Sequence, residues 1–308
     1  MDSILIALLP VFILIILGYG FKKLNFPNKD FWPYADKFTY YVLFPSLLIY
    51  KLSTASLDNI EGFSFVGAAV VTLLIISLVL IFMDKIALLF EGDVFTSVYQ
   101  GSIRFNTYVF LALVDAIYGD KGLILSAFLI TFLIPTINIL CISIFAIYAN
   151  SKKINIFSLI KSILTNPLII ACVIGGGINY LEVDLGASIE RTLAVLSSAA
   201  LPLGLLSVGV GLHLTQIKDA KIEIFSSVFL KLALFPVMIF FVGRAMGVEG
   251  LALNILVLFG AMPTASSSYI LASQLGGDIK TMSVIITAQT LLSILTISYL
   301  LSIMESIN

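Results

Sequence analysis

Long apolar stretches dominate the chain, and short polar segments interrupt them at fairly regular intervals. A helix needs roughly 20 mostly apolar residues to cross the hydrocarbon core of a bilayer. Ten segments fit this length, and they cover residues 4–21, 34–50, 63–83, 94–118, 122–148, 164–181, 189–212, 224–246, 251–275 and 279–303. The pattern predicts an all-α membrane protein with ten transmembrane helices and no room for a soluble domain.

The composition supports lipid as the main solvent. Of the 308 residues, 60% are hydrophobic and 11% are charged, and the mean hydropathy is +1.11. A soluble domain carries roughly 25% charged residues, and a net charge of −1 gives no indication of a nucleic-acid partner. Cys141 and Cys172 lie inside apolar runs, which favours buried thiols over a disulfide or metal site. No cofactor is expected.

Lysine and arginine are distributed unequally between the two sets of connections. One set carries twelve of them, including Lys231 near the start of the eighth segment, and the other carries four. The positive-inside rule then makes the first set cytoplasmic. We expect a multi-pass protein of the bacterial inner membrane with both termini outside, and a short interfacial helix in the cytoplasmic connection at 150–162.

The two halves of the chain are similar to each other at a constant offset of 157 residues. Four pairs of residues recur at this offset: Pro10 with Pro167, Gly18 with Gly175, Gly20 with Gly177 and Pro45 with Pro202. Because each half has five helices, an odd number, the second half would enter the membrane from the opposite face. The sequence predicts an inverted repeat of residues 1–151 and 152–308, the plan of many secondary transporters.

Polar interruptions occur in the fourth and ninth segments, where Asn106 and Pro263 stand 157 residues apart. We expect two broken helices that cross near the centre of the membrane. The half-helices that start there would present free N–H groups and partial positive charge to an anion. The alternative is a proline-kinked helix whose serines bond back to their own helix.

The candidate substrate-binding residues come from these interruptions and from polar positions of neighbouring segments. They are Arg104, Asn106, Thr107, Pro263, Thr264, Ser266, Ser267, Gln289, Asn138 and Ser46. An ionisable group at membrane depth is by default functional, and the planar fork of arginine suits a carboxylate. Arg104 has structural alternatives, namely an ion pair with Asp115 or Asp84, or extension toward one membrane face. Gln289 and Asn138 would either line the cavity or tie helices together.

Five stretches carry a resemblance to a known family. They are DKFTYYVLFPSLLIYKLS, GSIRFNTYVFLAL, TNPLIIACVIGGGINYL, SSAALPLGLLSVGVGL and AMPTASSSYILASQLGGD. In order and spacing they resemble the auxin efflux carrier family, which includes plant auxin carriers and bacterial carriers of malonate and other organic acids. The resemblance covers essentially the whole chain. Plant members have proline at both crossings, whereas this chain has Asn106 at the first.

The resemblance implies a scaffold of helices 1, 2, 6 and 7, usually dimeric, and a mobile transport unit of helices 3–5 and 8–10. The expected function is elevator-like transport of a small organic anion across the inner membrane. A sodium-coupled carrier similar to bile-acid symporters is the nearest alternative, followed by a channel. An enzyme is not expected, because the chain has no GxSxG motif and its LGGD lacks the first glycine of GxGD. The coupling ion stays open.

Overall fold

The computed structural model describes residues 2–55, 62–87, 90–149, 160–161, 164–214 and 222–307, and these ranges contain helices and no strand. The elements are α1 (Asp2–Leu24), α2 (Phe31–Phe38), the π-helix η1 (Thr39–Leu43), α3 (Phe44–Ser53), α4 (Gly62–Ala87), α5 (Gly92–Ile103), α6 (Thr107–Tyr148), α8 (Pro167–Tyr180), α9 (Gly186–Val210), α10 (Ile222–Phe229), the π-helix η3 (Leu230–Leu234), α11 (Phe235–Ala245), α12 (Gly250–Ala261), α13 (Ser267–Leu275) and α14 (Ile279–Ile307).

The described helices are long and apolar, as expected of a multi-pass membrane protein. Six of the described helical stretches are long and apolar enough to cross a bilayer, and the longest covers Gly92–Tyr148. The all-α expectation is confirmed, whereas the ten-helix inverted repeat stays a prediction. The expected interfacial helix at 150–162 and the boundary between the two halves lie almost wholly outside the described residues.

The long helix α6 contains a chain reversal. Gly119 has φ 58° and ψ −149°, which is not helical. A Cβ placed on Gly122 would lie 2.7 Å from Cγ1 of Val114, although eight helical residues normally span about 12 Å. The chain therefore turns back at Gly119, and α6 consists of two helical segments, one on each side of this glycine.

Two π-helical segments share one sequence context. Both η1 and η3 end in leucine and are followed by Phe-Pro, at Phe44-Pro45 and Phe235-Pro236. Proline has no N–H to close the preceding helical turn. The N–H of each phenylalanine instead bonds to the carbonyl five residues earlier. This wider turn adds one residue per segment and rotates the side chains on either side of it relative to each other.

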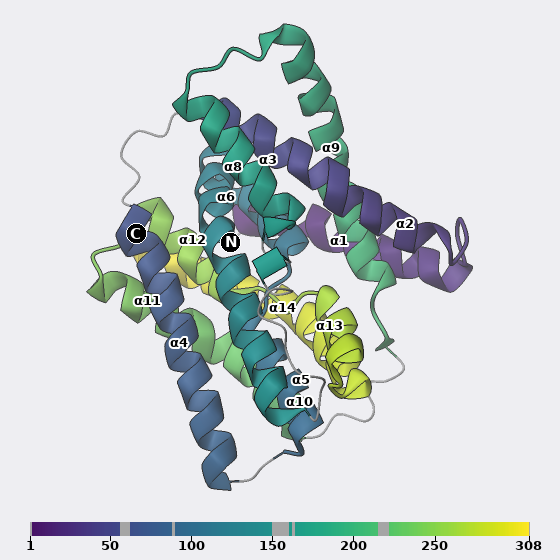
Figure 1. The fold of residues 1–308 in the computed structure, drawn as a ribbon, viewed down its shortest axis with the longest axis vertical. Helices are drawn as coiled ribbons and strands as arrows, with labels where there is room; N and C mark the ends of the chain where they lie inside the picture. The colour runs from purple at the N-terminus through teal and green to yellow at the C-terminus, as the bar shows by residue number, and fades with distance from the viewer. Residues whose placement is uncertain are drawn as a thin grey trace.

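The helices pack in two groups, and α6 contacts both of them. In one group α1 packs on α9, and α3 packs on α8 and α9; in the other α11 packs on α4 and α12, and α5 packs on α10 and α14. Figure 1 shows α3 and α8 side by side in the upper part of the view, with α4, α5 and α10 below. The described helices thus form two groups, which are joined through α6 and through a contact between α1 and α14.

Two glycines that pair at the 157-residue offset lie at close helix contacts. A Cβ on Gly18 of α1 would overlap the carbonyl oxygen of Leu206 in α9, and one on Gly175 of α8 would lie 3.0 Å from Cα of Ile49 in α3. Gly20 and Gly177, the second glycines of the pattern, have no atom within 4 Å of such a Cβ. Within each half, therefore, the close helix contact needs only the first of the two glycines, Gly18 or Gly175.

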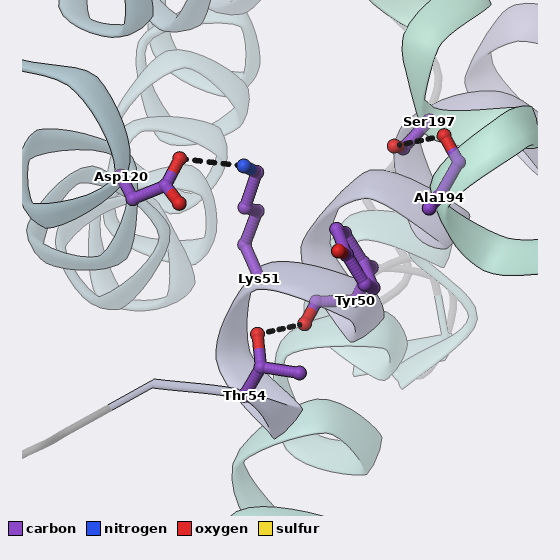
Figure 2. Close-up of polar contacts among 6 residues, drawn as sticks. All are labelled: Tyr50, Lys51, Thr54, Asp120, Ala194 and Ser197. Atoms are coloured by element: carbon purple, nitrogen blue, oxygen red, sulfur yellow. Dashed lines mark hydrogen bonds and ion pairs between the residues drawn. The ribbon is translucent and has the colours of Figure 1, made fainter. Parts of the chain in front are cut away.

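An ion pair among the described residues connects α3, in the first group, to α6. Lys51, in α3, lies within 2.5 Å of the Asp120 carboxylate, next to the reversal at Gly119. Figure 2 shows the lysine extending from α3 toward the neighbouring helices, while Thr54 and Ser197 bond to backbone carbonyls of their own helices. The Asp120 side chain is 71% exposed, so the pair is solvated and contributes little to stability.

Candidate functional site

Both polar interruptions are real breaks in the helical backbone. After α5 the chain is extended at Arg104 (φ −70°, ψ 157°), and α6 begins at Thr107. After α12 the chain is extended at Met262 (φ −67°, ψ 140°), and α13 begins at Ser267. A residue before proline is disfavoured in the helical region, so Pro263 explains the end of α12. The alternative of a merely kinked helix is wrong at both places.

The two breaks contact each other through the main chain. The N–H of Asn106 donates to the carbonyl of Pro263 at 2.8 Å. The side-chain oxygen of Asn106 accepts from the N–H groups of Tyr108 and Val109 at 3.1 and 3.2 Å, as a helix N-cap. Asn106 thus holds the start of α6 and joins it to the other break.

Gln289 of α14 satisfies backbone groups that the breaks leave free. Its Nε2 donates to the carbonyl of Gly101 at 2.9 Å and to that of Ser227 at 3.2 Å. Its Oε1 accepts from the N–H of Thr264 at 2.8 Å. The residue is fully buried. Of the two roles left open by the sequence, these contacts favour tying the helices together.

Arg104 lies between the breaks with a guanidinium that has no acidic partner among the described residues. Its Nη1 donates to Oδ1 of Asn138 at 3.2 Å, and its Nη2 donates to Oγ of Ser267 at 3.3 Å. Its Nε is buried without a partner. No ion pair with Asp84 or Asp115 is found in the described ranges. The arginine therefore carries an uncompensated positive charge at the start of α13.

The N-terminus of α13 lies next to this charge, and the N–H groups of Ser268 and Tyr269 donate to the carbonyls of Ala265 and Ser266 within its first turn. Ser266, its N-cap residue, makes no side-chain cap bond, and its buried Oγ has no partner. The first N–H groups of a helix point out of its N-terminus and carry partial positive charge. The guanidinium, the Ser266 and Ser267 hydroxyls and this helix end form an arrangement that suits a carboxylate.

The remaining candidate residues, Thr264, Ser46 and Thr107, lie near the crossing and make no hydrogen bond to Arg104 among the described contacts. Thr264 is buried, with Oγ1 3.4 Å from Oγ of Ser268. Ser46 of α3 donates to the carbonyl of Val42 in its own helix. Thr107 opens α6 and is half-buried. Because the rings of Phe44 and Tyr108 stack at 4.6 Å, the helix that carries Ser46 lies directly beside the crossing.

Lys231 is buried in the structure, although the charge distribution along the sequence predicted a position at the cytoplasmic surface. The positive-inside count puts it among the cytoplasmic charges, but its side chain in η3 is fully buried, so the basic set falls to eleven. Its Nζ has no hydrogen-bond partner and lies 4.2 and 5.2 Å from the ring centroids of Phe235 and Phe259. A desolvated cation–π contact supplies about 2 kcal/mol, less than the several kcal/mol needed to bury a charge.

The position of Lys231 within its apolar segment already indicates that this lysine is buried. Lys231 stands seven residues inside the apolar segment 224–246, about 10 Å along a helix. A cytoplasmic position requires that its long side chain reach the membrane surface, as lysines near helix ends do. The π turn and the two phenylalanines hold it inside instead.

Comparison with known proteins gives concordant results. The family described as "Membrane transport protein" matches residues 3–301. The chain is also 26% identical, over 319 aligned residues, to a protein of Rhizobium meliloti (strain 1021) named "Putative malonate transporter". That alignment covers 97% of this chain and 95% of the relative. The similarity therefore extends over the whole length of both proteins.

Proposed function

We propose, from the premise that this chain belongs to the membrane transport protein family, that it is a secondary carrier of a small organic carboxylate. The family places it among multi-pass membrane transporters and not among enzymes, which confirms the family resemblance given by the sequence. The substrate class, the route and the assembly are our proposal.

The observation that carries this proposal is the uncompensated positive charge at the helix crossing. Arg104 directs two N–H donors into hydrogen bonds with neutral partners, Asn138 and Ser267. It lies beside the N-terminus of α13, where the buried Ser266 hydroxyl has no partner. A partly buried charge without a counter-ion is costly. An anion that binds there removes this cost and gains charge-assisted hydrogen bonds.

A small dicarboxylate fits this chemistry. One carboxylate can replace the neutral partners of the Arg104 fork, and the hydroxyls of Ser266 and Ser267 can donate to its oxygens. The name of the Rhizobium meliloti relative points to malonate as the first acid to test. The fully buried Gln289 and Thr264 support the site from behind as positioning residues, because their bonds are made within the chain.

We propose an elevator-like route for the anion. The group containing α1, α3, α8 and α9 would be the scaffold of a dimer, whereas α4–α6 and α10–α14 would move with the crossing. The separate packing of the two groups supports this division. The inverted repeat and an inner-membrane location with both termini outside belong to the same proposal.

The test is uptake of radiolabelled malonate and other mono- and dicarboxylates by proteoliposomes containing the purified protein. We expect wild-type uptake of at least one such acid. We expect Arg104→Ala to reduce it about 10- to 100-fold, since hydrogen bonds to a charged group contribute about 1.5–3 kcal/mol. Arg104→Lys keeps the charge but not the fork, and its uptake is expected to lie in between.

Arg244→Ala is the matched control, because Arg244 is exposed and pairs with Glu249 at the end of α11. It is expected to transport like the wild type. Equal uptake by Arg104→Ala and Arg244→Ala would remove the assigned anion site. Failure of every tested carboxylate to enter would remove the proposed substrate class.

A further inference from the structure

The buried amine of Lys231 takes no part in the proposed anion site and is separated from it by phenylalanine side chains. The Lys231 side chain is fully buried, and its Nζ makes no hydrogen bond. It stands one helical turn after Ser227, whose backbone carbonyl and hydroxyl accept from Gln289. Lys231 is therefore on the helix that holds the crossing in place.

Two phenylalanine rings separate this amine from the anion site. The Phe259 ring lies 5.2 Å from Nζ, and its centroid is 4.8 Å from that of Phe105. Phe105 is the residue between Arg104 and Asn106 in the first break. An anion at Arg104 would thus face Nζ through an apolar layer in which electrostatic attraction is screened little.

No acid on the described elements packed against η3 compensates a charge on Lys231. Those elements are α5, α10, α11, α12 and α14, and their ionisable residues are Asp93, Tyr99, Glu223, Arg244, Lys280, Tyr299 and Glu305. α12 contributes none. The residue on the same helix, Glu223, precedes Lys231 by eight positions, about 12 Å.

The other ionisable groups of these elements are occupied or remote. Asp93 and Lys280 lie in the first turns of α5 and α14, eight residues before Gly101 and nine before Gln289. The Tyr99 hydroxyl donates to Ser77, and Arg244 pairs with Glu249. Tyr299 is 70% exposed, and Glu305 stands in the last turn of α14.

We propose that Lys231 binds one proton when the anion binds at the crossing and releases it when the anion leaves, so that anion and proton move together. The neutral amine takes the proton from a hydronium ion, and a water molecule remains when Nζ becomes an ammonium group. The reverse transfer occurs on the other side of the membrane. The inference rests on the proposed function, because the anion supplies the charge that stabilises the ammonium.

The test is calorimetric titration of the purified protein with malonate at pH 8, in two buffers with different ionisation enthalpies. The difference in heat gives the number of protons bound with each malonate, and the dicarboxylate itself is fully ionised at this pH. We expect the wild type to take up about half to one proton per malonate. Lys231→Met and Lys231→Gln should take up none, with an affinity independent of pH between 7 and 9.

Other groups are controlled in the same experiment. Burial and the nearby Lys22 lower the pKa of His213 from its ordinary value, so this histidine stays neutral at pH 8 and adds nothing. Lys51→Met removes a lysine that already has an acidic partner, the largely exposed Asp120, and it should keep the wild-type proton uptake.

Wild-type binding without proton uptake would overturn the proposal, and so would unchanged uptake in a folded Lys231 variant. Absence of any malonate heat with the wild type is a different result. It would reject malonate as the ligand of the proposed carrier, and with it this coupling. If both Lys231 variants fail to fold, wild-type binding without proton uptake still overturns the proposal.

Discussion

At the scale of single residues, the side-chain amide of Gln289 holds the centre of the molecule together. Each broken helix frees backbone groups that lipid cannot satisfy, and each unsatisfied group costs several kcal/mol in an apolar environment. Gln289 serves one such group from each break, the carbonyl of Gly101 and the N–H of Thr264. The polar residue that resembles a substrate ligand in the sequence is thus explained by the backbone.

Gln289→Ala is therefore expected to destabilise the protein by about 2–3 kcal/mol, because three backbone groups lose a hydrogen bond, namely the carbonyls of Gly101 and Ser227 and the N–H of Thr264. Thermal unfolding in detergent, followed by the fluorescence of Trp32, measures the change. Ser298→Ala on the same helix is the control, since its hydroxyl donates only to its own helix, and it should shift the melting temperature far less. A Gln289 variant as stable as this control would contradict the assigned role.

Lys231→Met is expected to have the opposite sign and to stabilise the protein by about 1–3 kcal/mol. Replacing a buried amine that has no partner by an apolar side chain of similar length removes a desolvation cost. The same melting assay applies, and Lys51→Met should change the stability by less than about 1 kcal/mol. Marked destabilisation by Lys231→Met would show that the amine has a stabilising partner in the folded protein.

At the scale of helices, the close approach of α1 to α9 depends on two glycines, one on each helix. Gly18 allows α1 to approach the backbone of α9, and Gly209 of α9 would likewise place a Cβ against the carbonyl of Ile15. The sequence pattern identifies Gly18 and Gly20 as equivalent. It cannot distinguish them, because the two glycines differ only in the direction in which their missing Cβ would point.

Gly18→Ala is expected to destabilise the α1–α9 contact by about 2–4 kcal/mol, since a methyl group there overlaps main-chain atoms that cannot move locally. Gly20→Ala is the matched control, two residues away on the same helix. It should be neutral or stabilising by up to about 1 kcal/mol, because its Cβ would meet nothing within 4 Å. Equal effects of the two variants in the melting assay would contradict so close an approach of α1 to α9.

At the scale of the whole molecule, the sequence predicted the apolar segments and the position of both breaks. The apolar runs are long, and Pro263 is a strong local signal, so these features follow from local physics. The bonds of Gln289 reach partners 25 to 188 residues away in sequence. Lys231 packs on Phe259, 28 residues away, as well as on the nearby Phe235. Such contacts are set by packing, which residue patterns along one helix do not describe.

Relative movement of the proposed scaffold and the moving helices can be tested at the ion pair between α3 and α6. In a protein in which Cys141 and Cys172 are replaced by serine, Lys51→Cys and Asp120→Cys would place thiols on α3 and on the turn of α6. A short bifunctional maleimide that joins them is expected to reduce uptake at least tenfold, because the two groups could no longer slide.

The single-cysteine variants treated with the same reagent are the controls, and both should keep their uptake. Full transport by the cross-linked double variant would show that the two groups do not need to move apart at this point. That result would count against an elevator, whereas it would leave the anion site at the crossing intact.

The bond from the N–H of Asn106 to the carbonyl of Pro263 joins the breaks without using any side chain. Every amino acid except proline supplies this donor. The side chain of Asn106 has a separate task, because its oxygen accepts from the N–H groups of Tyr108 and Val109. A residue that keeps the backbone N–H but cannot cap a helix would therefore leave the two breaks joined and weaken only the first turn of α6.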